Sequence, residues 1–242
     1  MIKVSELHKS FGKIKAVNGV SFEARDGRIT GLLGPNGAGK STTLRTLYTV
    51  LKPDSGSASI DGVDVVADSL KARARLGTLP HGSGLYPHLT ARENIRYYAR
   101  LYKMPEADIE PRIETLIDEL DIREFADRRT QGFSQGQRTK VALARALVHN
   151  PQNVVLDEPS NGLDVMATRS LRELIRKLKA QGRCVLFSSH VMQEVAALCD
   201  EIVIIAHGRV ALQDTPDGIR KRMKIDDLEE AFVKAITQTE MF

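Results

Sequence analysis

The sequence predicts an α/β protein in which a helical segment interrupts a set of strands. Three observations predict this fold. Short runs of β-branched residues alternate with longer helical patterns, which is typical of a sheet covered by helices. One apolar run ends in a glycine-rich loop, and from Thr90 to His149 only helical patterns occur. The length of 242 residues, with 42% apolar and 27% charged residues, suits one large domain or a core with an inserted subdomain.

The predicted strands are short and apolar. They are Ile2–Val4, Val20–Ala24, Ile29–Leu33, Ser57–Ile60, Leu76–Leu79, Asn153–Asp157, Cys184–Ser188 and Ile202–Ala206. The pair Asp61-Gly62 between Ile60 and Val63 predicts a tight hairpin turn. This hairpin indicates an antiparallel element beside the main sheet.

Capping residues predict where the helices begin. Thr90 with Glu93 has the pattern of a capping box, a second helix follows Pro105 and runs to about Asp121, and a third follows Ser134. The later helices are predicted by Asp164 as a cap with Gln181-Gly182 as its end, by Thr215-Pro216, and by an amphipathic pattern from Lys224 onward.

Composition and charge argue against several classes of protein. The formal net charge is only +4 and the signs alternate along the chain, so no nucleic-acid partner is expected. Cys184 and Cys199 stand alone among apolar neighbours, which favours buried, reduced thiols in a cytosolic protein. The start of the chain lacks the apolar stretch of a signal peptide. No apolar run approaches the roughly 18–20 residues that cross a bilayer, so a membrane role needs another polypeptide.

The glycine-rich loop matches a phosphate-binding pattern. It follows the strand that ends at Leu33, and its residues are Gly34, Pro35, Asn36, Gly37, Ala38, Gly39, Lys40, Ser41 and Thr42. Glycines let backbone N–H groups face a triphosphate, and the next helix presents its positive end. In this pattern Lys40 reaches the β- and γ-phosphates and the Ser41 hydroxyl coordinates Mg²⁺. A turn that merely joins strand to helix would not need the full pattern.

Two carboxylates and a histidine follow later strands. Asp157 and Glu158 end an apolar strand, where open α/β sheets place ligands. Adjacent like charges are costly unless a cation relieves them, so we assign Asp157 to a metal through one of its waters and Glu158 to polarising the attacking water. His190 can contact the γ-phosphate and orient that water. In isolation, an acidic loop or a loop histidine is more often solvated, so these roles depend on the phosphate-binding loop.

The order of these segments resembles the ABC transporter ATPase family over essentially the whole chain. Between the loop and His190 come a signature segment, Phe133–Gln137, the pair Asp157-Glu158, and a D-loop, Ser160–Asp164. The resemblance implies a P-loop NTPase (RecA-like) core, an antiparallel β subdomain and an inserted ABC-type α-helical subdomain. It implies an ATPase domain over 1–215, with its helical subdomain at about 88–149, and a C-terminal helical extension over 216–242.

The same resemblance implies ATP and Mg²⁺ as ligands and assigns further residues. Phe11 would stack on adenine and Val17 would pack beside it. The family works as a head-to-tail dimer, so Ser134, Gly136 and Gln137 would contact ATP held by the opposite subunit. An integral-membrane permease on a separate chain is the implied partner, reached from the cytoplasmic face of the membrane.

Two residues depart from the family pattern. Phe133 and Gln135 replace the commonest Leu and Gly of the signature segment. His81 stands where the family has Gln, whose oxygen is a ligand of Mg²⁺. We therefore expect His81 to hold the metal only through water. The signature segment and Leu228–Phe232 are similar to the branch serving sodium-efflux-type bacterial and archaeal exporters, which implies export.

Two rival functions remain at this stage. A non-transport ABC ATPase would act on ribosomes, DNA or an assembly scaffold, but such relatives usually have two cassettes or a long coiled coil. A P-loop GTPase or kinase would leave the signature segment unexplained. The sequence says nothing about cargo, because the permease selects it.

Overall fold

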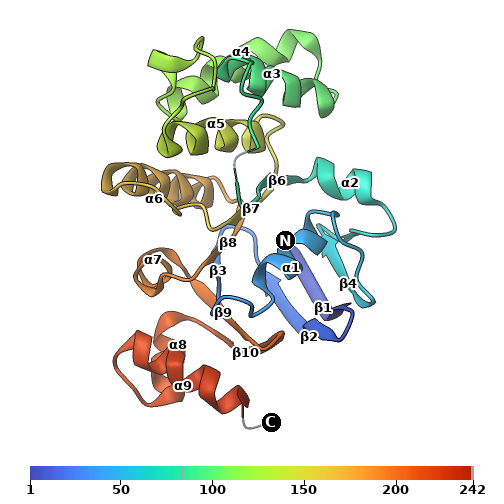
Figure 1. The fold of residues 1–242 in the computed structure, drawn as a ribbon, viewed down its shortest axis with the longest axis vertical. Helices are drawn as coiled ribbons and strands as arrows, with labels where there is room; N and C mark the ends of the chain where they lie inside the picture. The colour runs from blue at the N-terminus through green and yellow to red at the C-terminus, as the bar shows by residue number, and fades with distance from the viewer. Residues whose placement is uncertain (83, 241–242) are drawn as a thin grey trace.

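The computed structural model describes residues 1–82 and 84–240 and contains two sheets (Figure 1). The first is a 4-stranded antiparallel sheet with the order β2 (Ile14–Ala24), β1 (Ile2–Phe11), β4 (Ser55–Ile60), β5 (Val63–Asp64). The second is a 6-stranded sheet with the order β10 (Arg209–Asp214), β9 (Glu201–Ala206), β3 (Ile29–Leu33), β8 (Cys184–Ser189), β7 (Asn153–Asp157), β6 (Leu76–Leu79). Strands β9, β3, β8, β7 and β6 pair in parallel, so their carboxyl ends meet at one edge of this sheet.

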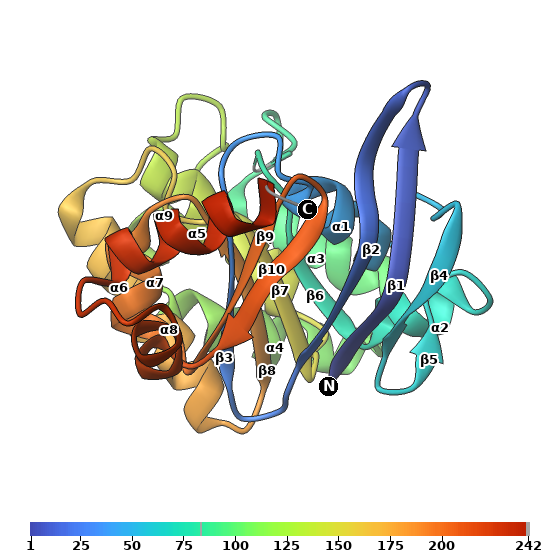
Figure 2. The ribbon, with the colours of Figure 1, turned by 90° about the horizontal axis from the view of Figure 1, so that it is seen from below.

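The helices surround the larger sheet and extend beyond it at both ends (Figure 1). They are α1 (Lys40–Leu47), α2 (Ser69–Ala74), α3 (Ala91–Leu101), α4 (Glu106–Glu119), the 3-10 turn η1 (Arg123–Phe125), α5 (Gln135–Leu147), α6 (Val165–Ala180), α7 (Met192–Leu198), α8 (Pro216–Met223) and α9 (Leu228–Glu240). Figure 2 shows α9 along the β9–β10 side of the molecule, with the antiparallel sheet on the opposite flank. Across the described ranges, no helix combines the length and the apolar character that crossing a membrane requires.

The larger sheet separates two clusters of buried apolar side chains. Successive residues of a strand point to opposite faces, so Leu32 and Leu186 join the cluster under the antiparallel sheet. Their neighbours Leu33 and Phe187 join the cluster under the helices. Every residue of β3, β7 and β8 is buried, as expected for parallel strands covered on both faces. This burial fixes the strand ends from which the functional residues project.

Most predicted boundaries are confirmed. Ile60 pairs with Val63 across the predicted hairpin, and the side chains of Thr90, Ser134, Asp164 and Thr215 cap α3, α5, α6 and α8. The tail helix begins at Leu228 rather than at Lys224, because Lys224 ends α8 in the left-handed conformation, with φ 56°. The predicted extension 216–242 is described only as far as residue 240.

Several elements were not predicted, namely α2, α7, β10 and most of the β1–β2 hairpin. This hairpin extends to Phe11, which pairs with Ile14. In its outer part Leu7 and Val17 are buried but their neighbours are half-buried or exposed, so no continuous apolar run identifies it. The strands there are stabilised mainly by pairing with each other.

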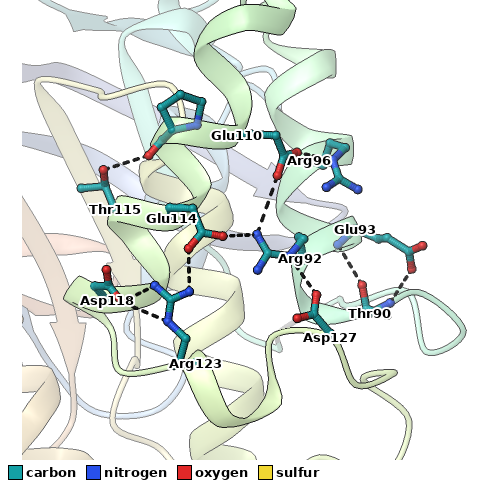
Figure 3. Close-up of polar contacts among 11 residues, drawn as sticks. Thr90, Arg92, Glu93, Arg96, Glu110, Glu114, Thr115, Asp118, Arg123 and Asp127 are labelled. Atoms are coloured by element: carbon teal, nitrogen blue, oxygen red, sulfur yellow. Dashed lines mark hydrogen bonds and ion pairs between the residues drawn. The ribbon is translucent and has the colours of Figure 1, made fainter.

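An ion-pair network joins the helices of the inserted segment (Figure 3). Arg92 of α3 pairs with Glu114 of α4 and with Asp127, and Arg123 of η1 pairs with both Glu114 and Asp118. Exposed ion pairs contribute only about 0–1 kcal/mol each, so we attribute most of the stability to the apolar cluster beneath them. The network instead restricts how α3 and α4 sit relative to each other.

Candidate active site

The phosphate-binding loop leads from the carboxyl end of β3 into α1. Lys40 at the start of α1 is 5% exposed, and its Nζ donates to the carbonyl oxygens of Gly34 (2.6 Å) and Pro35 (3.1 Å). Gly39 has φ 104°, and a Cβ there would lie 2.4 Å from the carbonyl oxygen of Ala16. Only glycine fits this position, because both the conformation and the space exclude a side chain. A lysine ammonium has three donors, so Lys40 can also donate to a phosphate oxygen.

Opposite charges lie near the Lys40 ammonium. Burial lowers the pKa of Lys40, while the nearby carboxylates of Glu158 and Asp157 act to raise it. Both carboxylates therefore favour the charged form of the Lys40 ammonium. This arrangement brings the loop lysine and the pair Asp157-Glu158 together at the carboxyl edge of the sheet.

Register between β7 and β8 positions the two carboxylates. Asp157 pairs with Ser188, and the Ser188 hydroxyl donates to Asp157 Oδ1 (2.6 Å). The same hydroxyl accepts from the Glu158 backbone N–H (3.0 Å), which helps to hold Glu158 at φ 49°. Such left-handed backbone is uncommon outside glycine and often occurs at functional sites. His190 Nδ1 lies 3.3 Å from Glu158 Oε1, so the third predicted group also reaches the site.

A cavity of about 450 Å³ lies beside these carboxylates. It is lined by residues 79–82, by the start of α5 and by the end of β7 with the residues that follow it, including His81, Gln135, Asp157, Glu158 and Asn161. Among the described residues no group of three or more His, Cys, Asp and Glu side chains could hold a metal by itself. A metal here would need oxygens from a nucleotide as well. The Ser41 hydroxyl and the Asp157 carboxylate are oxygen donors, which fits Mg²⁺.

The two residues assigned to the base differ in accessibility. Phe11, at the end of β1, is 48% exposed, with the Lys9 ammonium 5.8 Å from its ring centroid. Val17 in β2 is only 1% exposed and packs in the same apolar cluster as Ala38. Phe11 thus offers a ring face to a ligand, whereas Val17 offers almost no side-chain surface.

The signature segment begins α5 in the helical segment. The Ser134 hydroxyl accepts from the Gln137 backbone N–H (3.2 Å), and the Gln137 side chain accepts from the Ser134 backbone N–H (3.0 Å). Ser134 is exposed, so the amino end of α5 faces solvent next to Gly136. Phe133 is buried against Phe125, with ring centroids 5.3 Å apart, which accounts for an aromatic residue at this position.

Ser188 is a site residue that sequence reasoning missed as a functional group. It was used only to define the end of a strand, although its hydroxyl contacts Asp157 and the backbone of Glu158. A polar residue at the buried carboxyl end of a parallel strand was the available signal, because buried hydroxyls need hydrogen-bond partners.

A parallel sheet with this loop, lysine and carboxylate pair at its carboxyl edge defines a P-loop nucleoside triphosphatase. Residues 17–161 match the family described as ABC transporter, and this chain belongs to that family. The chain is 40% identical over 226 residues to the ABC transporter ATP-binding protein NatA of Bacillus subtilis (strain 168), covering 93% of this chain and 92% of the relative. It is 37% identical to the Nod factor export ATP-binding protein I of Ralstonia nicotianae, covering 89% and 67% of the two chains.

Solved structures agree with this assignment. A structure described as the ATP-binding subunit of an ABC transporter superposes with a TM-score of 0.90 at 30% identity, covering 97% of this chain and 99% of the other. The cassette MJ0796, in a dimeric post-hydrolysis state bound to ADP and Pi, gives a TM-score of 0.80 at 26% identity, covering 89% and 98%. The chain is an ATP-binding, ATP-hydrolysing subunit of the ABC transporter type.

Proposed function

We propose that two copies of this chain hydrolyse Mg²⁺-ATP at a shared seam and drive export through a separate membrane permease from its cytoplasmic face. The observation that supports this most directly is that the site residues come from two separate parts of the chain, the sheet edge and the helical segment. Lys40, Asp157, Glu158 and His190 gather at the carboxyl edge of the sheet, whereas exposed Ser134 begins α5 in the helical segment. A second copy can supply the serine-capped helix end that completes the phosphate site.

Each residue of the site has one task in this mechanism. Lys40 and the loop amides bind the phosphates, and Ser41 and Asp157 would hold Mg²⁺, which supplies charge neutralisation when bound. Glu158 accepts a proton from the attacking water, and His190, whose side chain is 49% exposed, orients that water and the γ-phosphate. The Ser188 hydroxyl bonds to the side chain of Asp157 but to the backbone of Glu158. This difference allows the two carboxylates to have separate roles.

Cross-linking across the seam tests the head-to-tail homodimer. Asn36 and Ser134 are both exposed, so we expect the double variant Asn36→Cys/Ser134→Cys to be joined into covalent dimers by a short bis-maleimide when ATP is present. The native thiols do not interfere, because both are buried and burial raises the pKa of Cys184 to about 12 and that of Cys199 further. Denaturing electrophoresis gives the yield of covalent dimer.

The single-cysteine chains are the matched controls and should give little covalent dimer. A double variant that gives equal cross-linking with and without ATP, or none under either condition, contradicts the ATP-dependent seam.

An exposed aromatic patch supports the permease assignment. Tyr86 (44% exposed) and Tyr97 (42% exposed) meet edge to face with ring centroids 5.2 Å apart, beside Leu101 (58% exposed). Asn94 bonds both backbone groups of Tyr86, so α3 holds the backbone of Tyr86 in place. A membrane partner seated on this patch would contact residues that follow closely in sequence on His81, which lines the cavity. The name of the Nod factor relative, an export ATP-binding protein, supports export as the direction of transport.

His81 provides a separate test of the metal site. It lines the cavity beside Asp157 and Glu158, but imidazole is a poorer Mg²⁺ ligand than an amide oxygen. We expect His81→Gln to lower the Mg²⁺ concentration for half-maximal ATP hydrolysis by about 3- to 10-fold, in the range of one added neutral ligand contact. His88→Gln, an exposed histidine of the same loop, is the control. An unchanged Mg²⁺ dependence in His81→Gln would remove His81 from the neighbourhood of the metal.

A further inference from the structure

The carboxylate of Glu194 connects two loops of the site. Glu194 lies in the first turn of α7, and its Oε2 accepts from the hydroxyl of Ser160 in the D-loop (2.6 Å). The same oxygen accepts from the hydroxyl of Ser189 at the end of β8 (3.2 Å). Ionised acceptors form stronger hydrogen bonds than neutral ones. One oxygen therefore links the D-loop to the strand that precedes His190.

Both serines adjoin groups of the site. Ser160 is two residues beyond Glu158, and the backbone N–H of the next residue, Asn161, donates back to the Glu158 carbonyl (3.1 Å). Ser189 is 2% exposed and immediately precedes His190, and its hydroxyl accepts from the backbone N–H of Val191 (3.0 Å). A shift of either loop would disturb the hydrogen bonds that meet at Glu194.

We propose that Glu194 is a positioning residue that ties the D-loop to the His190 loop and so maintains the 3.3 Å contact between His190 and Glu158. This inference rests on the proposed roles of Glu158 and His190. Glu194 acts through Ser160 and Ser189 and has no contact with the reacting atoms. Because the D-loop directly follows the carboxylates, the link makes the geometry of the water-activating pair depend on the position of the D-loop.

Substitution of Glu194 tests the link. Displacements of the order of 1 Å in a catalytic group can cost up to about 100-fold in rate, so we expect Glu194→Ala to lower kcat by about 10- to 100-fold. KM and ATP affinity should stay the same, because Lys40 and the phosphate-binding loop are untouched. Glu194→Gln should retain most of the activity, since one amide oxygen has two lone pairs and can accept both hydroxyls. The exposed neighbour Gln193→Ala is the matched control.

A double variant distinguishes the link from a purely structural role of Glu194 in α7. If the Ser160 contact matters, adding Ser160→Ala to Glu194→Ala should change kcat little beyond the single substitution. Additive losses, a Glu194→Ala kcat within twofold of wild type, equal losses in Glu194→Gln and Glu194→Ala, or a loss matched by a lower Tm would each overturn the proposal.

Comparison with Glu158→Gln separates this inference from the proposed function. If Glu158→Gln is inactive while Glu194→Ala is fully active, only the role of Glu194 fails. If Glu158→Gln hydrolyses ATP as wild type does, the assignment of the water-activating pair fails, and the role of Glu194 fails with it.

Discussion

Glu158→Gln should lower kcat for ATP hydrolysis by about 10²–10⁴-fold while leaving ATP binding intact, because loss of a general base typically has this effect. Glutamine has the same shape and keeps an oxygen toward His190, but it cannot accept the proton of the attacking water. The hydrogen bonds that shape this turn use the backbone N–H of Glu158, so the substitution leaves them in place. Dimers should therefore accumulate with ATP, since closure survives and hydrolysis does not.

Single-turnover hydrolysis and size-exclusion chromatography with Mg²⁺-ATP measure the two halves of this prediction. Glu173→Gln makes the same chemical change on the exposed face of α6 and should leave both measurements unchanged. Hydrolysis at the wild-type rate in Glu158→Gln would show that another group activates the water.

The parts of the site that lie within continuous motifs could be predicted from the sequence. Residues Gly34–Thr42 and Asp157-Glu158 each follow an apolar strand, and parallel strands bring such ends to one edge of a sheet. The meeting of Lys40 with the two carboxylates follows from that topology alone. Sequence reasoning succeeded here because the chemistry and the local backbone are encoded in the same few residues.

Contacts between distant segments could not be predicted in this way. The bonds of Ser188 to Asp157 and of Ser160 to Glu194 join residues 31 and 34 positions apart, and they depend on strand register and on the placement of α7. The helix α7 has only 7 residues and its N-cap side chain makes no capping bond, so no start signal exists. The accessibility of Val17 likewise depends on how the antiparallel sheet packs.

Lys40→Ala should weaken ATP binding itself, by about 10- to 100-fold, because hydrogen bonds to charged groups contribute about 1.5–3 kcal/mol each. The 5% exposure of Lys40 means that its charge acts in a poorly solvated site, where water cannot replace it. Removing the ammonium also leaves Asp157 and Glu158 without the nearby positive charge of Lys40, which adds repulsion against a triphosphate. Equilibrium binding of a labelled ATP analogue measures the change.

The matched control is Lys52→Ala, which removes one positive charge from an exposed position. Since the net charge of the two variants is equal, a difference in affinity between them reports the position of Lys40 and not the overall field of the protein. Lys40→Met keeps most of the buried stem and should bind ATP as poorly as Lys40→Ala, because the ammonium makes the phosphate contact. Wild-type affinity in both Lys40 variants would mean that the loop amides alone hold the nucleotide, and the contribution of Lys40 would then be limited to hydrolysis.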